Sequence, residues 1–143
     1  MKLGRQLKQE AVEAQLEEAG VSPTPQRVEI ARIMLSQPQH MSAEDVLVAL
    51  RKAGAAASKA TVYNTLRLFA QCGLLRTVIV DPTKVFYDSN IAPHHHFYDV
   101  EAGTLTDFRA EEVQLTRLPD LPQGAAIDGV DITVRVRRTR REK

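Results

Sequence analysis

The chain has 143 residues, 43% of them apolar and 26% charged, and its formal net charge is +1. That length suits one domain or two small ones sharing a core, and the composition is typical of a soluble globular protein. No apolar run is long enough to span a bilayer, and the N-terminus lacks a secretory signal. The single cysteine, Cys72, excludes a disulfide framework and an all-thiolate zinc site. We therefore expect a cytoplasmic protein without a membrane partner.

Two helices are predicted at the start of the chain. Apolar residues recur at helical spacing over 3–19, and Gly20 then supplies a stop. Thr24 can cap a second helix that begins at Pro25, where the missing N–H costs nothing. Pro38 ends that helix.

The next two helices are indicated by their caps and apolar stripes. Ser42 and Asp45 resemble a capping box with Asp in place of Glu, which predicts a third helix that ends at Gly54. A fourth helix is predicted from Ser58 to about Gln71. Its outward face carries polar and small residues, namely Lys59, Ala60, Tyr63, Asn64, Arg67 and Gln71.

After the fourth helix the sequence becomes rich in β-forming residues. Two β-branched runs around a proline turn predict a hairpin over 74–88, and a second hairpin is predicted over 94–108 with its turn at Ala102–Gly103. A short, weak helix is expected over 110–118. Alternating apolar and polar residues predict a final strand over 129–137.

This order of elements predicts an α+β protein with two domains. Residues 1–88 would form a winged helix-turn-helix, whose last helix enters the major groove of DNA. Residues 89–143 would form a small domain for dimerisation and sensing, because an isolated sheet of this size rarely stands alone. We therefore expect a homodimer.

The fourth helix has the side chains that a recognition helix needs. Lys59 and Arg67 suit phosphate or guanine, Asn64 suits adenine, and Tyr63 suits stacking or a thymine methyl. Phosphate contacts are expected from Arg27 and from Lys84 on the wing. The full candidate set is Arg27, Lys59, Ala60, Thr61, Tyr63, Asn64, Arg67 and Lys84. The alternative is an ordinary solvated helix face, since the net charge is nearly neutral.

Three of the four histidines are consecutive, at 94–96. On a strand His94 and His96 point to one face and His95 to the other. Imidazoles bind Zn(II), Mn(II) and Fe(II), and they also serve as axial ligands of haem iron. The alternative is an exposed cluster without a ligand.

Several stretches in their chain order resemble the ferric uptake regulator family. They are SPTPQRVEIARIML, HMSAEDVLVALRKAG, SKATVYNTLRLFAQCGLL and the histidine cluster that runs into GTLTDF. The resemblance covers almost the whole chain. It implies a dimeric, metal-responsive bacterial transcription regulator with an N-terminal winged helix and a C-terminal α/β dimerisation domain.

The sequence departs from the family pattern at two places. The family's Cys-x-x-Cys pair falls on Asp99 and Ala102, so the structural zinc held by four cysteines is expected to be absent. The usual His-His-Asp-His run reads Pro-His-His-His over 93–96, and a family Glu ligand falls on Tyr87, beside Asp88. A triple His without the cysteines resembles the iron response regulator branch. Members of that branch act when iron is scarce and sense haem.

The resemblance implies a metal site that joins the two domains. It places His40 beside His94 and His96, with Asp88 or Glu101 as a possible oxygen ligand for iron, manganese or zinc. A metal there would fix the angle between the domains, and its affinity should fall at acid pH because each imidazole must be neutral.

The haem alternative uses the same cluster. His95 would be free for this second role, so the haem candidates are His94, His95 and His96. Because the chain has no Cys-x-x-Cys-His motif, any haem would be bound without a covalent bond.

Two features stay without an assigned role. Cys72, at the end of the fourth helix, is interpreted as a small buried hydrophobe. The segment RVRRTRREK at the C-terminus is either a nucleic-acid contact or a solvated end.

Three functions are compatible with these features. The first is a regulator of iron or haem homeostasis that binds an A·T-rich pseudo-palindrome and is gated by haem or a divalent metal. The second is a conventional repressor activated by Fe(II), Mn(II) or Zn(II). A haem or metal carrier that docks on a protein is the third. A metalloenzyme is not expected, because no His-Glu-x-x-His or nucleophile motif is present.

Overall fold

The computed structural model describes residues 2–139, with side chains from residue 8 onward. It divides into two compact units, Met1–Ile91 and Ala92–Lys143. The last part of the basic C-terminal segment therefore lies outside the described residues. No helix among the described residues has both the length and the apolar character needed to cross a bilayer.

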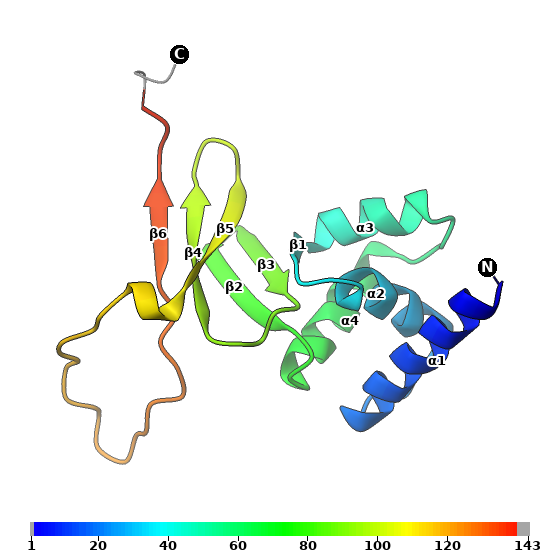
Figure 1. Ribbon diagram of the computed structural model, residues 1–143, viewed down its shortest axis with the longest axis horizontal. Coiled ribbons are helices and arrows are strands. Elements are labelled where there is room, and N and C mark those ends of the chain that lie inside the picture. The colour runs from blue at the N-terminus through cyan, green and yellow to red at the C-terminus, as the bar shows by residue number, and fades with distance from the viewer. Residues whose placement is uncertain (1, 140–143) are drawn as a thin grey trace. The chain divides into compact units, whose positions relative to one another are not determined.

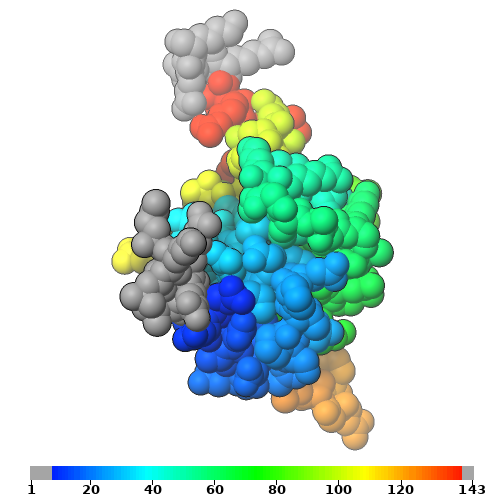
Figure 2. Space-filling model, turned by 90° about the vertical axis from the view of Figure 1, so that its right-hand side faces the viewer, coloured from blue at the N-terminus to red at the C-terminus, as the bar shows by residue number. Residues whose placement is uncertain are grey.

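The first unit is built on the helices that the sequence predicts. They are α1 (Lys2–Glu18), α2 (Pro25–Leu35), α3 (Ala43–Lys52) and α4 (Lys59–Gln71). Figure 1 shows them packed together, and Figure 2 shows α1 and α2 side by side on one face. Their shared core is fully buried and includes Leu16, Ile30, Met34, Val46, Leu66 and Phe69. This core fixes the direction of α4 and thus the side chains that α4 exposes.

The helix caps form as predicted. The Thr24 side chain accepts a hydrogen bond from the Arg27 N–H at the start of α2. Ser42 accepts from the Asp45 N–H at 3.2 Å, and Asp45 accepts from the Ser42 N–H at 3.0 Å, so the capping box is complete. Such caps satisfy N–H groups that have no partner within the helix.

A small antiparallel sheet completes the first unit. Its strands are β1 (His40–Ser42), β2 (Arg76–Asp81) and β3 (Lys84–Asp88), in the order β1-β3-β2. Strands β2 and β3 form the predicted hairpin, or wing. The sequence did not predict β1, because three residues carry no periodicity and this strand exists only through its pairing with β3.

The second unit is a three-stranded mixed sheet. It consists of β4 (His94–Asp99), β5 (Thr104–Arg109) and β6 (Thr133–Val136) in the order β5-β4-β6. Strand β4 pairs antiparallel with β5 and parallel with β6. Gly103 has φ +71° in the β4–β5 turn, a conformation that glycine adopts without strain.

The prediction of a helix over 110–118 is largely wrong. The structure has only the 3-10 turn η1 (Ala110–Glu112), followed by the open loop that Figure 1 shows before β6. A short helix in water depends on burying an apolar face, and in this loop Leu115 and Leu118 remain 51% and 45% exposed. The other large apolar side chains exposed in this unit are Phe97, Leu121, Ile127, Val130 and Val134.

Candidate functional site

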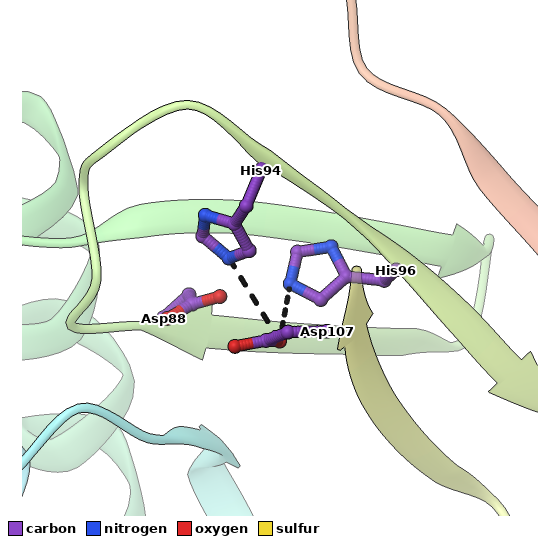
Figure 3. A group of neighbouring side chains, drawn as sticks. All are labelled: Asp88, His94, His96 and Asp107. Atoms are coloured by element: carbon purple, nitrogen blue, oxygen red, sulfur yellow. Dashed lines mark ion pairs between the residues drawn. The ribbon is translucent and has the colours of Figure 1, made fainter. Parts of the chain in front are cut away.

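Two histidines and one aspartate of the second unit converge on a single point. His94 and His96 lie on the same face of β4, and Asp107 lies on β5 directly opposite His96. The Asp107 Oδ1 is 3.4 Å from the His96 Nε2 and 3.9 Å from the His94 Nε2. Figure 3 shows both imidazole rings directed at this carboxylate. The two rings meet edge to face, with centroids 4.6 Å apart.

The hydrogen bond of His94 fixes which nitrogen faces the centre. Its Nδ1 lies 2.7 Å from the Ala92 carbonyl oxygen. A carbonyl can only accept, so Nδ1 carries a proton, and in the neutral ring Nε2 keeps its lone pair. That lone pair faces Asp107. An imidazole held by a backbone carbonyl in this way is the usual form of a metal-ligating histidine.

The spacing of these atoms fits a divalent metal. One ligand atom from each of His94, His96 and Asp107 can be chosen so that all three lie within 4.8 Å of one another. Ligand atoms about 2.0–2.1 Å from a tetrahedral metal lie about 3.3 Å apart, so small side-chain movements would close the set. Both histidines are buried, at 6% and 2% exposure. Two imidazoles and one carboxylate suit zinc, manganese or iron.

His95 is not free for a second role, contrary to the sequence-based expectation. It lies on the other face of β4, as predicted, but its Nδ1 accepts a hydrogen bond from the Ile132 N–H at 3.2 Å. Its ring packs on Phe108, with centroids 5.6 Å apart. A neutral ring that accepts at Nδ1 carries its proton at Nε2, where an axial haem ligand needs a lone pair.

His40 and Asp88 are neighbours within the first unit. They are register partners on β1 and β3, which places their side chains on one face of the small sheet. Asp88 is 1% exposed, and its Oδ1 accepts a hydrogen bond from the Asn90 N–H at 2.9 Å. His40 meets Phe86 edge to face at 6.4 Å. Figure 3 also draws Asp88.

The structure does not bring Glu101 to the histidines. Glu101 follows the end of β4, and its carboxylate lies 3.5 Å from the Arg137 guanidinium. Glu101 lies five positions after His96, and at about 3.3 Å of rise per residue the strand carries it well away from that histidine. Asp107 is the carboxylate that lies beside the histidines instead, and sequence reasoning missed it. The predicted two-residue turn at 102–103 would pair His96 with Arg109, whereas the observed connection over 100–103 places Asp107 opposite His96.

The outward face of α4 is largely as predicted. Lys59, Ala60, Asn64 and Arg67 are exposed, whereas Thr61 is half-buried and its Oγ1 lies 2.9 Å from the Ser58 Oγ. Thr61 thus contacts the N-cap residue Ser58 at the start of α4.

Tyr63 does not stand free on this face. Its hydroxyl donates a hydrogen bond to the Glu44 carboxylate at the start of α3. This bond lowers the pKa of Glu44 and raises that of Tyr63. Sequence reasoning did not identify Glu44, because nineteen residues separate the two.

The two candidate phosphate contacts are held loosely. The Arg27 guanidinium donates to the Ser22 carbonyl at 3.0 Å, and the Lys84 Nζ lies 5.5 Å from the centroid of the Phe86 ring. The wing turn before Lys84 is fixed by Asp81, which accepts from the Thr83 N–H and hydroxyl at 2.7 Å each. These bonds lower the pKa of Asp81.

Asp99 forms a clamp at the turn of the second unit. Its Oδ1 accepts from the Glu101 and Ala102 N–H groups at 2.9 Å each, and its Oδ2 accepts from the Arg138 Nε at 3.1 Å. The two backbone bonds and the arginine hold the pKa of Asp99 below its usual range.

Cys72 is half-buried at the C-cap of α4.

Comparison with known proteins gives one consistent result. Residues 18–134 match the ferric uptake regulator family. The chain is 35% identical over 107 residues to the ferric uptake regulation protein of Synechococcus elongatus, covering 72% of this chain and 73% of that one. It is 33% identical over 96 residues to the peroxide-responsive repressor PerR of Staphylococcus aureus, covering 67% and 65%.

A solved structure gives the same match in three dimensions. The ferric uptake regulator of Pseudomonas aeruginosa with manganese superimposes with a TM-score of 0.67 at 27% identity, covering 88% of this chain and 96% of that one.

Proposed function

Because the chain belongs to the ferric uptake regulator family, we propose that it is a dimeric transcription regulator whose binding to DNA is gated by a divalent metal at the histidine cluster. Members of this family are metal-responsive regulators that bind DNA as dimers, and they are not enzymes. The single observation that carries the gating is the convergence of His94, His96 and Asp107 on one point.

The proposed metal site is centred on the second unit. His94, His96 and Asp107 supply three ligand atoms, and His40 and Asp88 are the further candidates from the first unit. Only five residues of chain separate Asp88 from His94, which keeps this carboxylate within reach. A metal that binds the DNA-competent state more tightly would shift the protein toward that state, which is the switch that a regulator needs.

The proposed DNA-binding surface is the exposed face of α4 with the wing. Arg27, Lys59, Ala60, Tyr63, Asn64, Arg67 and Lys84 would contact DNA, and Thr61 would support the helix start. We propose an A·T-rich pseudo-palindrome as the target, with half-sites about one helical turn apart. The division of work follows: residues 1–88 bind DNA, and residues 89–143 dimerise and hold most of the metal ligands.

Haem is the competing signal, as in the iron response regulator branch. The imidazoles of His94 and His96 could serve as axial ligands of haem iron. His95 would first have to give up its hydrogen bond with the Ile132 N–H. Two relatives support the metal instead. The Synechococcus protein is named for ferric uptake regulation, and the Pseudomonas structure holds manganese.

The test is fluorescence anisotropy with chelator-treated protein and a labelled A·T-rich palindromic duplex. Binding that appears only with Mn(II) or Fe(II) supports metal gating. If the protein binds the duplex without metal and haem then releases it, haem is the signal in place of the metal. A protein that binds no duplex under any of these conditions contradicts the regulator, and the carrier alternative then gains support.

A further inference from the structure

The tyrosine on the recognition helix is held at two points. Its hydroxyl donates to Glu44 on α3, and the Lys59 Nζ lies 5.9 Å from the centroid of its ring. Tyr63 is half-buried and Glu44 is exposed. A tyrosine side chain fixed at its hydroxyl and over its face presents one ring edge in one orientation.

A carboxylate is an unusual group on a surface that meets DNA. Glu44 and Tyr63 line a cleft of about 220 Å³ together with Thr83 and Lys84 of the wing. Each phosphate that approaches Glu44 is repelled. The hydrogen bond from Tyr63 and the charges of Lys59 and Lys84 lower the pKa of Glu44, so the carboxylate is ionised at neutral pH.

We propose that Glu44 is a positioning residue for DNA reading, which directs the apolar edge of Tyr63 toward thymine methyl groups and penalises DNA that lacks them. The proposal rests on the proposed function of α4. A hydroxyl that already donates to Glu44 cannot donate to a phosphate, so the ring contributes through its apolar edge, the part that suits a thymine methyl. The repulsion between Glu44 and phosphate weakens binding to every sequence, whereas the methyl contact is gained only on DNA that carries thymine at that place.

The simpler alternative is a structural tie between α3 and α4. In that case removal of Glu44 lowers the stability of the first unit and weakens binding to all duplexes in proportion. It does not change the ratio of affinities between duplexes that differ only in thymine methyl groups. That ratio therefore separates the two roles.

The experiment measures the affinity of full-length, metal-loaded protein for three labelled duplexes by anisotropy. The first is an A·T-rich pseudo-palindrome selected from a random pool by the unsubstituted protein, the second carries deoxyuridine for every thymidine, and the third is scrambled. Removal of one thymine methyl that the ring touches should weaken binding about fourfold. The unsubstituted protein should prefer thymidine by at least that factor.

The variants E44A and E44Q test the two parts of the proposal separately: the orientation of Tyr63 and the repulsion between Glu44 and phosphate. E44A should bring the thymidine-to-deoxyuridine ratio close to one. E44Q should keep the ratio, because its amide oxygen still accepts from Tyr63, yet it should bind the scrambled duplex more tightly. The control E17Q removes an exposed acid from α1 and should change neither quantity.

Several results would overturn the proposal. The first is that the unsubstituted protein binds the selected duplex without preferring thymidine. The second is that E44A keeps the thymidine-to-deoxyuridine ratio. The third is that E44Q leaves the affinity for the scrambled duplex unchanged. If E44A fails to fold, Y63F replaces it, because that variant keeps the ring but cannot donate to Glu44, and its ratio should fall close to one. A protein that binds none of the duplexes contradicts the proposed function itself, which is a different and recognisable outcome.

Discussion

Asp107 lies directly across the hairpin from His96, with its Oδ1 3.4 Å from the imidazole Nε2. A neutral imidazole that presents a lone pair to a carboxylate is electrostatically unfavourable unless a cation or a proton lies between them. The hydrogen bond from His94 to the Ala92 carbonyl directs a second lone pair to the same place. A proton shared with Asp107 or a divalent metal at this place would relieve the repulsion.

Replacement of Asp107 tests this arrangement. D107N keeps the shape of the side chain and removes its charge, so Mn(II) affinity should fall by roughly 10–100-fold or more. Isothermal titration of chelator-treated protein measures it. Glu101→Gln is the matched control, because its carboxylate pairs with Arg137 at the other end of the hairpin. An unchanged affinity in D107N would remove Asp107 from the ligand set.

The Asp99 clamp should make the stability of the second unit depend on acid pH. Because folding lowers the pKa of Asp99 from its ordinary 3.8, its contribution is fully present above that value and is lost as the pH falls through the lower folded pKa. D99N should therefore flatten the decline of Tm below about pH 4. Thermal melts from pH 2 to 7 test this, with D120N in the exposed loop as the control. Parallel melting curves for D99N and the unsubstituted protein would contradict it.

Arg67 and Lys84 should affect DNA binding in different ways. Arg67 is on the exposed face of α4, and its change to Ala should cost about 1–3 kcal/mol on the selected duplex and much less on a scrambled one. Lys84→Ala on the wing should weaken both duplexes alike and lower the salt slope of log K by about one per wing. Anisotropy titrations at several salt concentrations measure both. Equal effects of R67A on the two duplexes would assign Arg67 to the phosphate backbone.

The capping box at Ser42 should contribute measurably to the stability of the first unit. Ser42→Ala removes the acceptor for the Asp45 N–H and should cost about 1 kcal/mol in urea unfolding. Ser36→Ala, at the exposed end of α2, should stay within about 0.5 kcal/mol. A loss in S42A no larger than in S36A would mean that water replaces the cap without cost.

The exposed apolar residues of the second unit are the candidates for the dimer contact. Leu118 is 45% exposed in the loop before β6, so Leu118→Asp should leave the fold of one chain intact. It should raise the dimer dissociation constant by placing a charge in an apolar interface. Light scattering at micromolar concentration reports the change. Gln114→Asp in the same loop is the control, and a dimer that tolerates both substitutions would place the contact elsewhere.

The local sequence determined most elements of both units. The caps at Thr24 and Ser42, the apolar stripe of α4 and the turns at Pro82 and Gly103 act within a few residues, so pattern and propensity sufficed to predict them. The alternating faces of His94, His95 and His96 follow from strand geometry alone. The resemblance to the ferric uptake regulator family likewise needed only short stretches in the right order, and the matched residues 18–134 confirm it.

The tertiary structure alone decided which side chains meet. Strand β1 exists because β3 pairs with it, and Tyr63 reaches Glu44 because the core sets α3 against α4. His95 was expected to be free, but it accepts a hydrogen bond from Ile132, which lies 37 positions away in the sequence. The helix expected after β5 did not form, because no surface within the described part of the chain buries its apolar side chains. Local propensity specifies single elements, whereas contacts between distant residues depend on the packing of the whole chain.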